Sequence, residues 1–187
     1  SFEPVSAKTQ SPVIPLDFQP EITTQVSSKF VQAGDKFVDG LAVRVTKHSW
    51  IKVNGNPVPV GAVGTLYGPF DEQPAEANAP PAGSPVAGTE KVTLTAPGNY
   101  TSPGTIVAPE SGFYTWVWSI DKTAQGEFAK YLTDSFTDRF GLVAETSVTP
   151  FQPEAVSKAD QRLVKPGDSV TDTINVSSTN GRWLKQG

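Results

Sequence analysis

Apolar and polar side chains alternate along several short segments of the chain, a pattern that predicts β-strands. In residues 37–45 (FVDGLAVRV) the apolar Leu41, Val43 and Val45 stand at every second position, as expected of a strand with one buried face. In residues 112–120 (GFYTWVWSI) Trp116 and Trp118 share one face, and core packing is the expected role of that face. Further strands are predicted over 23–31, 58–67, 91–96, 105–108 and 140–148, with turns rich in Gly, Pro and Asn between them.

Two segments do not follow this alternation. The stretch from Gly68 to Glu90 carries five prolines and predicts a long surface loop. Residues 124–136 have apolar side chains at intervals of three and four, which predicts a short helix or a structured crossover. About seven strands with one such helix indicate an all-β fold, an antiparallel Ig-like β-sandwich with a long Pro-rich loop.

An internal repeat organises the chain. Residues 18–54 align without a gap over residues 151–187, at an offset of 151 − 18 = 133, and twelve of these 37 positions are identical. The identities are Phe18, Gln19, Pro20, Glu21, Val31, Gly34, Asp35, Asp39, Val43, Thr46, Trp50 and Lys52, which recur as Phe151, Gln152, Pro153, Glu154, Val164, Gly167, Asp168, Asp172, Val176, Thr179, Trp183 and Lys185. Trp50 and Trp183 are both expected in a core.

The repeat predicts a lead-in over 1–17, a complete unit over 18–150 and the first part of a second copy over 151–187. A period of 133 residues is too long for a solenoid repeat, so an array of whole domains is expected. A segment of 37 residues is too short to bury a sandwich core by itself. We therefore expect 151–187 to pack against the complete unit or against a neighbouring chain.

Composition excludes several classes of function. The chain has no Cys and a single histidine, His48, which rules out thiol chemistry, a His-based triad and a multi-His metal site, and His48 is expected in a surface loop. The net charge is −4 without a basic cluster, so nucleic acid is not an expected partner. No apolar run reaches the length of a membrane span.

Two acidic residues are weak candidates for a site. Asp35 and Asp39 form a GDxxxD pattern that recurs in the second copy, and their carboxylate oxygens are of the type that binds Ca²⁺. Capping of the turn explains Asp35 without a metal. The expectation is no cofactor, with Ca²⁺ as the alternative. Because the pattern repeats in tandem, a structural role is favoured over catalysis, and the chain is predicted not to be an enzyme.

Exposed aromatic rings suggest a second kind of site. Tyr67 and Phe70 flank a Gly-Pro pair at the start of the long loop, where they are candidates for stacking on a sugar ring. They represent the alternative function, a carbohydrate- or matrix-binding module, possibly accessory to a secreted hydrolase.

The succession of a Thr-rich strand, xGDxxxD, a Trp, an NG turn, GTLYGPF and GFYTWVW resembles tandem repeats of cell-wall-anchored surface proteins of actinobacteria and related Gram-positive bacteria. The resemblance spans most of 18–150. It implies a cell-surface adhesin or stalk, secreted and attached to the cell wall, in which the repeat acts as a non-catalytic spacer or adhesive segment. The implied partners are neighbouring repeat units and, for an adhesive segment, a host or environmental glycan or matrix protein.

Repeats of this kind often carry a Lys–Asn isopeptide or a Thr–Gln ester between their first and last strands. This sequence departs from both patterns, because residues 140–148 contain no Gln or Asn and have Glu145 and Thr146 there instead, and because His48 lies outside that segment. The sequence therefore does not predict an ester. It leaves open an isopeptide from Lys29 to Asp134 or Asp138, which would lower the mass by about 18 Da.

Overall fold

The computed structural model describes residues 16–185 and shows an all-β fold, which confirms the expected fold class. The strands are β1 (Gln19–Val26), β2 (Asp39–Lys47), β3 (Lys52–Val53), β4 (Asn56–Pro57), β5 (Val60–Phe70), β6 (Val86–Leu94), β7 (Gly98–Thr101), β8 (Gly112–Ile120), β9 (Phe136–Thr137), β10 (Thr146–Thr149), β11 (Pro153–Ala159) and β12 (Asp172–Ser178). Two 3₁₀ segments complete it, η1 (Lys122–Tyr131) and η2 (Val143–Glu145).

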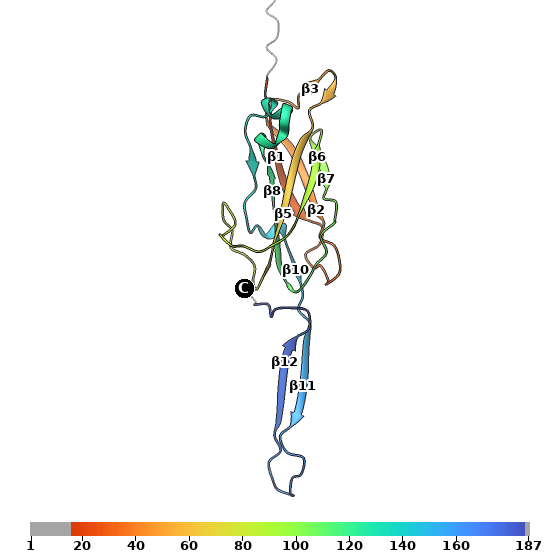
Figure 1. Ribbon diagram of the computed structural model, residues 1–187, viewed down its shortest axis with the longest axis vertical. Coiled ribbons are helices and arrows are strands. Elements are labelled where there is room, and N and C mark those ends of the chain that lie inside the picture. The colour runs from red at the N-terminus through yellow and green to blue at the C-terminus, as the bar shows by residue number, and fades with distance from the viewer. Residues whose placement is uncertain (1–15, 186–187) are drawn as a thin grey trace, which may run out of the picture.

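Two antiparallel sheets form the body of the molecule (Figure 1). One has the order β1-β2-β7, and the other has the order β10-β8-β5-β6, with β9 paired to β8. Their inward side chains form one apolar core, because strand alternation points every second residue at the opposing sheet. The architecture is therefore sandwich-like, with β3, β4 and η1 at the end where the described chain begins.

Two tryptophans on β8 occupy the centre of the core, as their alternation predicts. Trp116 and Trp118 are fully buried, and their rings stack with centroids 5.6 Å apart. Gly64 on β5 makes room for this pair: a Cβ at that position would lie 2.5 Å from the Trp118 ring. The missing side chain thus allows Trp118 to lie flat against β5.

We expect Gly64→Ala to destabilise the fold by about 1–3 kcal/mol, since the ring can move only by disturbing its packed neighbours. Gly61→Ala on the same strand is the matched control, because its Cβ would meet only Gln125, at 3.5 Å. Chemical denaturation of the two variants measures the difference. Equal midpoints would contradict this account of the core.

Several predicted boundaries were wrong. Strand β6 begins at Val86 rather than at residue 91, because its backbone already pairs with β5 there, which shortens the loop to 71–85. Residues 105–108 form only an isolated bridge through Val107. The predicted helix is a 3₁₀ segment, interrupted by non-helical backbone at Gly126 (φ 58°).

The second copy of the repeated sequence folds into a hairpin that repeats the first one in detail. The register pairs Pro20 with Val45 in β1–β2 and Pro153 with Ser178 in β11–β12, which are equivalent positions at the offset of 133. The Phe18–Trp50 ring contact (4.9 Å) recurs as Phe151–Trp183 (4.6 Å). A positive φ recurs as well: His48 (59°) is matched by Gly181 (127°).

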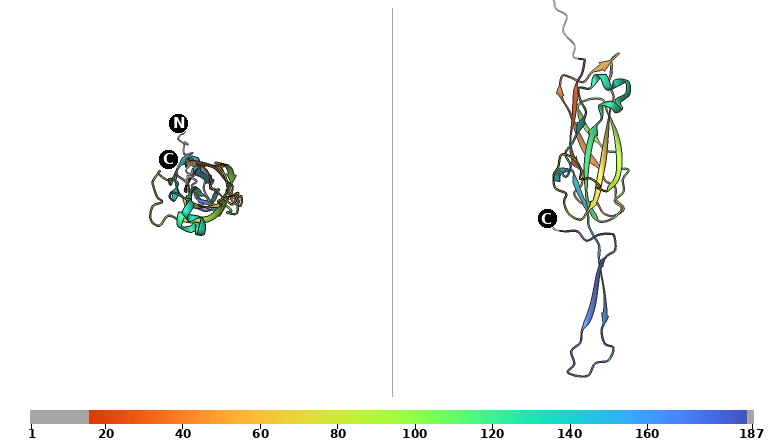
Figure 2. Two further views of the ribbon diagram at one scale, coloured as in Figure 1. Left: turned by 90° about the horizontal axis from the view of Figure 1, so that it is seen from above. Right: turned by 60° about the vertical axis from the view of Figure 1, so that its left-hand side comes forward.

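The hairpin projects away from the sandwich, at the end opposite the first described residues (Figure 1; Figure 2, right). Its strands are exposed along almost their whole length. Only its base contacts the complete unit: Ser111 donates its backbone N–H to the Asn180 carbonyl (2.8 Å), and Arg182 pairs with Asp71 (2.8 Å). The expected packing of 151–187 against the complete unit is thus limited to this base, and Trp183, expected in a core, is 47% exposed.

Candidate functional site

Four carboxyl groups cluster inside the sandwich and form what we term the acid cluster: Asp39, Glu90, Asp138 and Glu145. Asp39, Glu90 and Glu145 are at most 3% exposed, and each of the four has one buried oxygen without a hydrogen-bond partner among the described residues. Buried acids are costly unless they are paired or neutral. Such a concentration of buried carboxyl groups makes the acid cluster the candidate functional site.

Asp39 is held between the two sheets. It is the first residue of β2, and its Oδ2 accepts a hydrogen bond from the indole Nε1 of Trp118 on β8 (2.7 Å). Its backbone N–H donates to Ser102 Oγ (2.9 Å). Because Gly64 sets the position of the Trp118 ring, the core packing also orients this carboxyl group.

Glu145 lies at the end of η2, directly before the last strand of the sandwich. Its Oε1 accepts a hydrogen bond from the hydroxyl of Thr24 on β1, and both side chains are buried. Ile22, Thr24 and Val26 share the inward face of β1 through strand alternation. The hydroxyl on the first strand and the carboxyl beside the last strand are therefore neighbours in the core.

Burial keeps this carboxyl group neutral. Desolvation is the main cause that raises the pKa of Glu145 to about 10; the neighbouring Asp138 also raises it, and the hydrogen bond from Thr24 lowers it. Desolvation also raises the pKa of Asp39, to about 7, against the lowering effect of the Trp118 hydrogen bond. At neutral pH Glu145 is therefore a carboxylic acid rather than a carboxylate.

This arrangement has the parts needed for an acyl transfer within the chain. A neutral carboxyl group has an electrophilic carbonyl carbon, whereas a carboxylate resists attack by a nucleophile. The Thr24 hydroxyl, which is hydrogen-bonded to Glu145 Oε1, is the nucleophile nearest to it. Among residues 16–185 no group of three or more His, Cys, Asp or Glu is arranged to hold a metal ion.

A row of backbone and side-chain hydrogen bonds connects the same two parts of the chain. Val31 N–H donates to the Val148 carbonyl (3.0 Å), Val148 N–H donates to the Lys29 carbonyl (2.7 Å), and Ser147 Oγ donates to the Ser28 carbonyl (2.6 Å). The bridge between Phe30 and Val148 is parallel. We term residues 28–31 with 147–148 the terminal clamp.

The structure separates the two candidate calcium ligands. Asp35 is exposed in a turn, where its N–H donates to the Gln32 carbonyl, whereas Asp39 points into the core. The two do not form a common site, because strand β2 starts after Asp35 and turns Asp39 inward.

Tyr67 and Phe70 do not form an open platform for a sugar. Both rings are half-buried and pack edge-on against Phe140, with centroid distances of 5.8 Å and 5.9 Å. Their position next to a loop suggested exposure, but Phe140 packs against both rings, and Ala77 in the loop 71–85 pairs with Phe140.

The structure does not bring together the candidate isopeptide residues. Lys29 follows the end of β1, and its Nζ donates to the Val143 and Thr146 carbonyls; no carboxylate of residues 16–185 lies within 4.0 Å of it. Asp134 lies at the other end of β1, where its N–H donates to Gln19 Oε1 (3.0 Å). Asp138 instead belongs to the acid cluster, beside Glu145.

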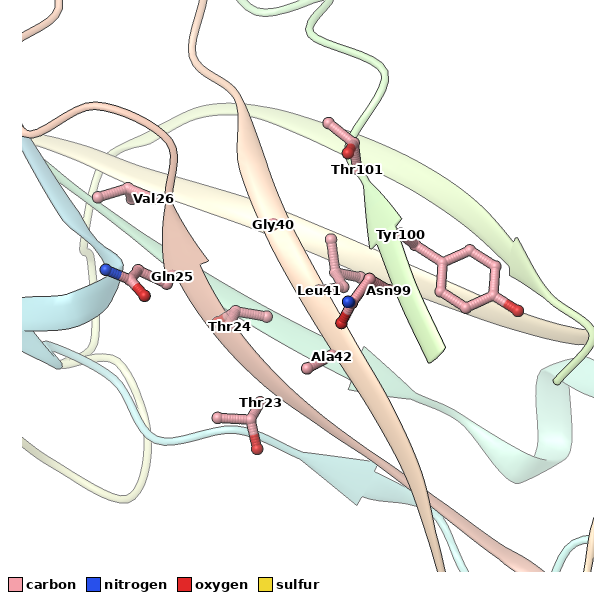
Figure 3. A pocket seen from close by; sticks show the side chains of 10 residues that line it. All are labelled: Thr23, Thr24, Gln25, Val26, Gly40, Leu41, Ala42, Asn99, Tyr100 and Thr101. Atoms are coloured by element: carbon pink, nitrogen blue, oxygen red, sulfur yellow. The ribbon is translucent and has the colours of Figure 1, made fainter. Parts of the chain in front are cut away.

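The exposed face of the β1-β2-β7 sheet carries a shallow hollow of about 510 Å³ (Figure 3). Uncharged side chains line it, among them Thr23 and Gln25 from β1, Ala42 from β2 and Asn99 from β7. No charged group is aimed into it, so its chemistry does not indicate a ligand.

Sequence reasoning missed the Thr24–Glu145 pair, although one indication was available. The alternation of β1 puts Thr24 on the apolar face between Ile22 and Val26, where a hydroxyl needs a partner. The identity of that partner, 121 residues further on, depends on the path of the chain between the sheets.

In the described part of the chain no helix is both long and apolar enough to cross a membrane. No protein-family model matches the sequence, and a comparison with curated proteins gives no match.

Proposed function

We propose that residues 18–150 form a load-bearing spacer module of an extracellular cell-surface protein, repeated in tandem and closed by an ester bond between Thr24 and Glu145. The observation that carries this proposal is the buried contact between the Thr24 hydroxyl and the neutral Glu145 carboxyl group. The two-sheet architecture and the Trp-filled core support assignment to the Ig-like class of sandwiches.

The route of the chain supports a mechanical role. The described chain enters at one end of the sandwich, and both the hairpin and the last described residues lie at the opposite end (Figure 1). Force on the two ends pulls the two parallel segments of the terminal clamp along the chain in opposite directions, so several hydrogen bonds must break together. A covalent bond between Thr24 and Glu145 joins the same two parts of the chain. It carries the force when the hydrogen bonds of the terminal clamp break.

The reaction is balanced without any added reagent. Thr24 Oγ attacks the carbonyl carbon of the protonated Glu145, the new C–O bond forms, the bond from that carbon to its hydroxyl breaks, and one water leaves. Fixed orientation of two buried groups replaces a bimolecular encounter, which can lower the barrier by several kcal/mol. The proton of the Thr24 hydroxyl passes to the departing hydroxyl, which leaves as that water.

Intact mass under denaturing conditions tests the ester. We expect the purified chain to weigh about 18 Da less than its sequence, and a digest to yield one peptide that joins the segments containing Thr24 and Glu145. Thr24→Val should restore the full mass, and Thr23→Val, at the exposed neighbour on β1, should keep the deficit.

Mild alkali distinguishes the ester from an isopeptide, because it hydrolyses an ester and leaves an amide intact. Full mass in the unmodified chain contradicts the ester. A deficit that survives Thr24→Val and alkali would assign the cross-link to an amine such as Lys29.

A further inference from the structure

The β11–β12 hairpin exposes a face that is buried in its counterpart. Leu41 is 1% exposed and Val43 5%, whereas the equivalent Ile174 is 61% exposed and Val176 54%. The same contrast holds for the turn between the strands, where Phe37 (1%) corresponds to Val170 (68%). The hairpin therefore presents one apolar face that nothing in residues 16–185 covers.

This face is already organised to receive a sheet. The register, the Phe–Trp contact and the positive φ at the strand end all match the β1–β2 hairpin, which packs on the β10-β8-β5-β6 sheet. The turn geometry matches too: Asp35 N–H donates to the Gln32 carbonyl and Asp168 N–H to the Lys165 carbonyl. A hairpin that needed a different partner would have no reason to keep these features.

The polar residues on this face restrict the partner further. Asp172 stands where Asp39 is buried, and Ser157 keeps a hydroxyl where Thr24 donates to Glu145. Asp39 is tolerated in the core because the Trp118 indole donates to it. The partner that packs on this face must therefore supply an indole-like hydrogen-bond donor opposite Asp172 and a hydrogen-bond acceptor for Ser157.

We infer that the occupant of this face is a segment built like residues 55–150 of this chain, which completes a second sandwich unit with the hairpin as its first two strands. A second hairpin of the same kind fits poorly, since it would place two Asp172 carboxylates in one interface. The complete unit cannot accept the hairpin, because β1 and β2 already fill that position. The inference rests on the tandem arrangement in the proposed function but does not depend on the ester.

The offset of 133 allows a direct test with the full chain. Gly187 corresponds to Asn54, so residues 55–150 are appended after Gly187 without a linker. In the 187-residue chain we expect hairpin amides at 155–158 and 173–176 to exchange quickly, because isolated two-stranded hairpins are marginally stable. In the extended chain their hydrogen exchange should slow by at least about 100-fold as a second folded unit forms.

Matched variants and a folding control make the result decisive. In the extended chain Ile174→Asp, on the inward face, should abolish the added protection, whereas Asn175→Asp, at the position of the exposed Ala42, should retain it. Two directly joined copies of 16–150 serve as the control that tandem units fold.

Unchanged exchange in the extended chain, beside a folded control, overturns the inference. So does a 187-residue chain that is dimeric by light scattering with its hairpin already protected, because the occupant is then a second copy. Either result leaves the mass deficit of the Thr24–Glu145 ester unaffected, so failure of this inference and failure of the cross-link are distinguishable.

Discussion

Under tension, the protein with valine at position 24 should extend about 400 Å further than the unmodified protein before its chain becomes taut. The proposed ester would join residues 121 positions apart, and the enclosed segment contributes about 3.3–3.6 Å per residue once it is free to stretch. Thr24→Val removes the nucleophile and keeps a side chain of nearly the same shape. Single-molecule force spectroscopy on a chain held at its two ends measures the difference in contour length.

Thr23→Val provides the control for this measurement, since Thr23 is on the same strand but exposed. It should extend no further than the unmodified protein. If the unmodified protein already releases the full length of the sandwich, the covalent closure is wrong and the terminal clamp alone bears the force.

The stability of the Thr24→Val protein should fall as the pH rises from about 5 to 9. The pKa of Glu145 is about 10 in the fold against 4.5 for an ordinary glutamate, and that of Asp39 is about 7 against 3.8 for an ordinary aspartate. The folded state therefore binds more protons than the unfolded state throughout this range, and the free energy of unfolding decreases with pH. A group that is protonated in the folded state and ionised in the unfolded state lowers the free energy of unfolding by about 1.4 kcal/mol per pH unit.

Urea denaturation at a series of pH values measures this slope. The double variant Thr24→Val, Glu145→Gln cannot titrate at position 145, so its slope should be smaller and should level off above the pKa of Asp39. The unmodified protein should also have a smaller slope than the Thr24→Val protein, since an esterified Glu145 carries no proton to lose. Equal slopes in all three proteins would show that Glu145 does not stay neutral in the fold.

The local patterns of the sequence were sufficient for the fold class and for the central strand. Alternation in 112–120 predicted the buried Trp116 and Trp118, because strand geometry makes burial periodic whatever the rest of the fold does. Boundaries that depend on pairing were not predictable in this way. Strand β6 extends to Val86 only because β5 lies beside it, and the sequence of 86–90 is not strongly apolar.

The candidate site was harder to predict for the same physical reason. Asp39 was singled out, but as a candidate Ca²⁺ ligand, since its partner Trp118 lies 79 residues further along the chain. Tyr67 and Phe70 were expected to be exposed because they adjoin a loop, and only the folded loop shows that Phe140 covers them. Long-range contacts of this kind leave no local periodicity in the sequence.

The connection between the sandwich and the hairpin is short and firmly bonded. Pro150 and Pro153 bracket it, the Pro150 carbonyl accepts from Asn180 Nδ2 (2.8 Å), and Arg182 ties the base to Asp71. Such a joint resists rotation about the long axis as well as bending. In a tandem array each unit would therefore be turned from the last by one fixed angle, and the array would be a torsionally stiff rod whose faces recur with a helical period.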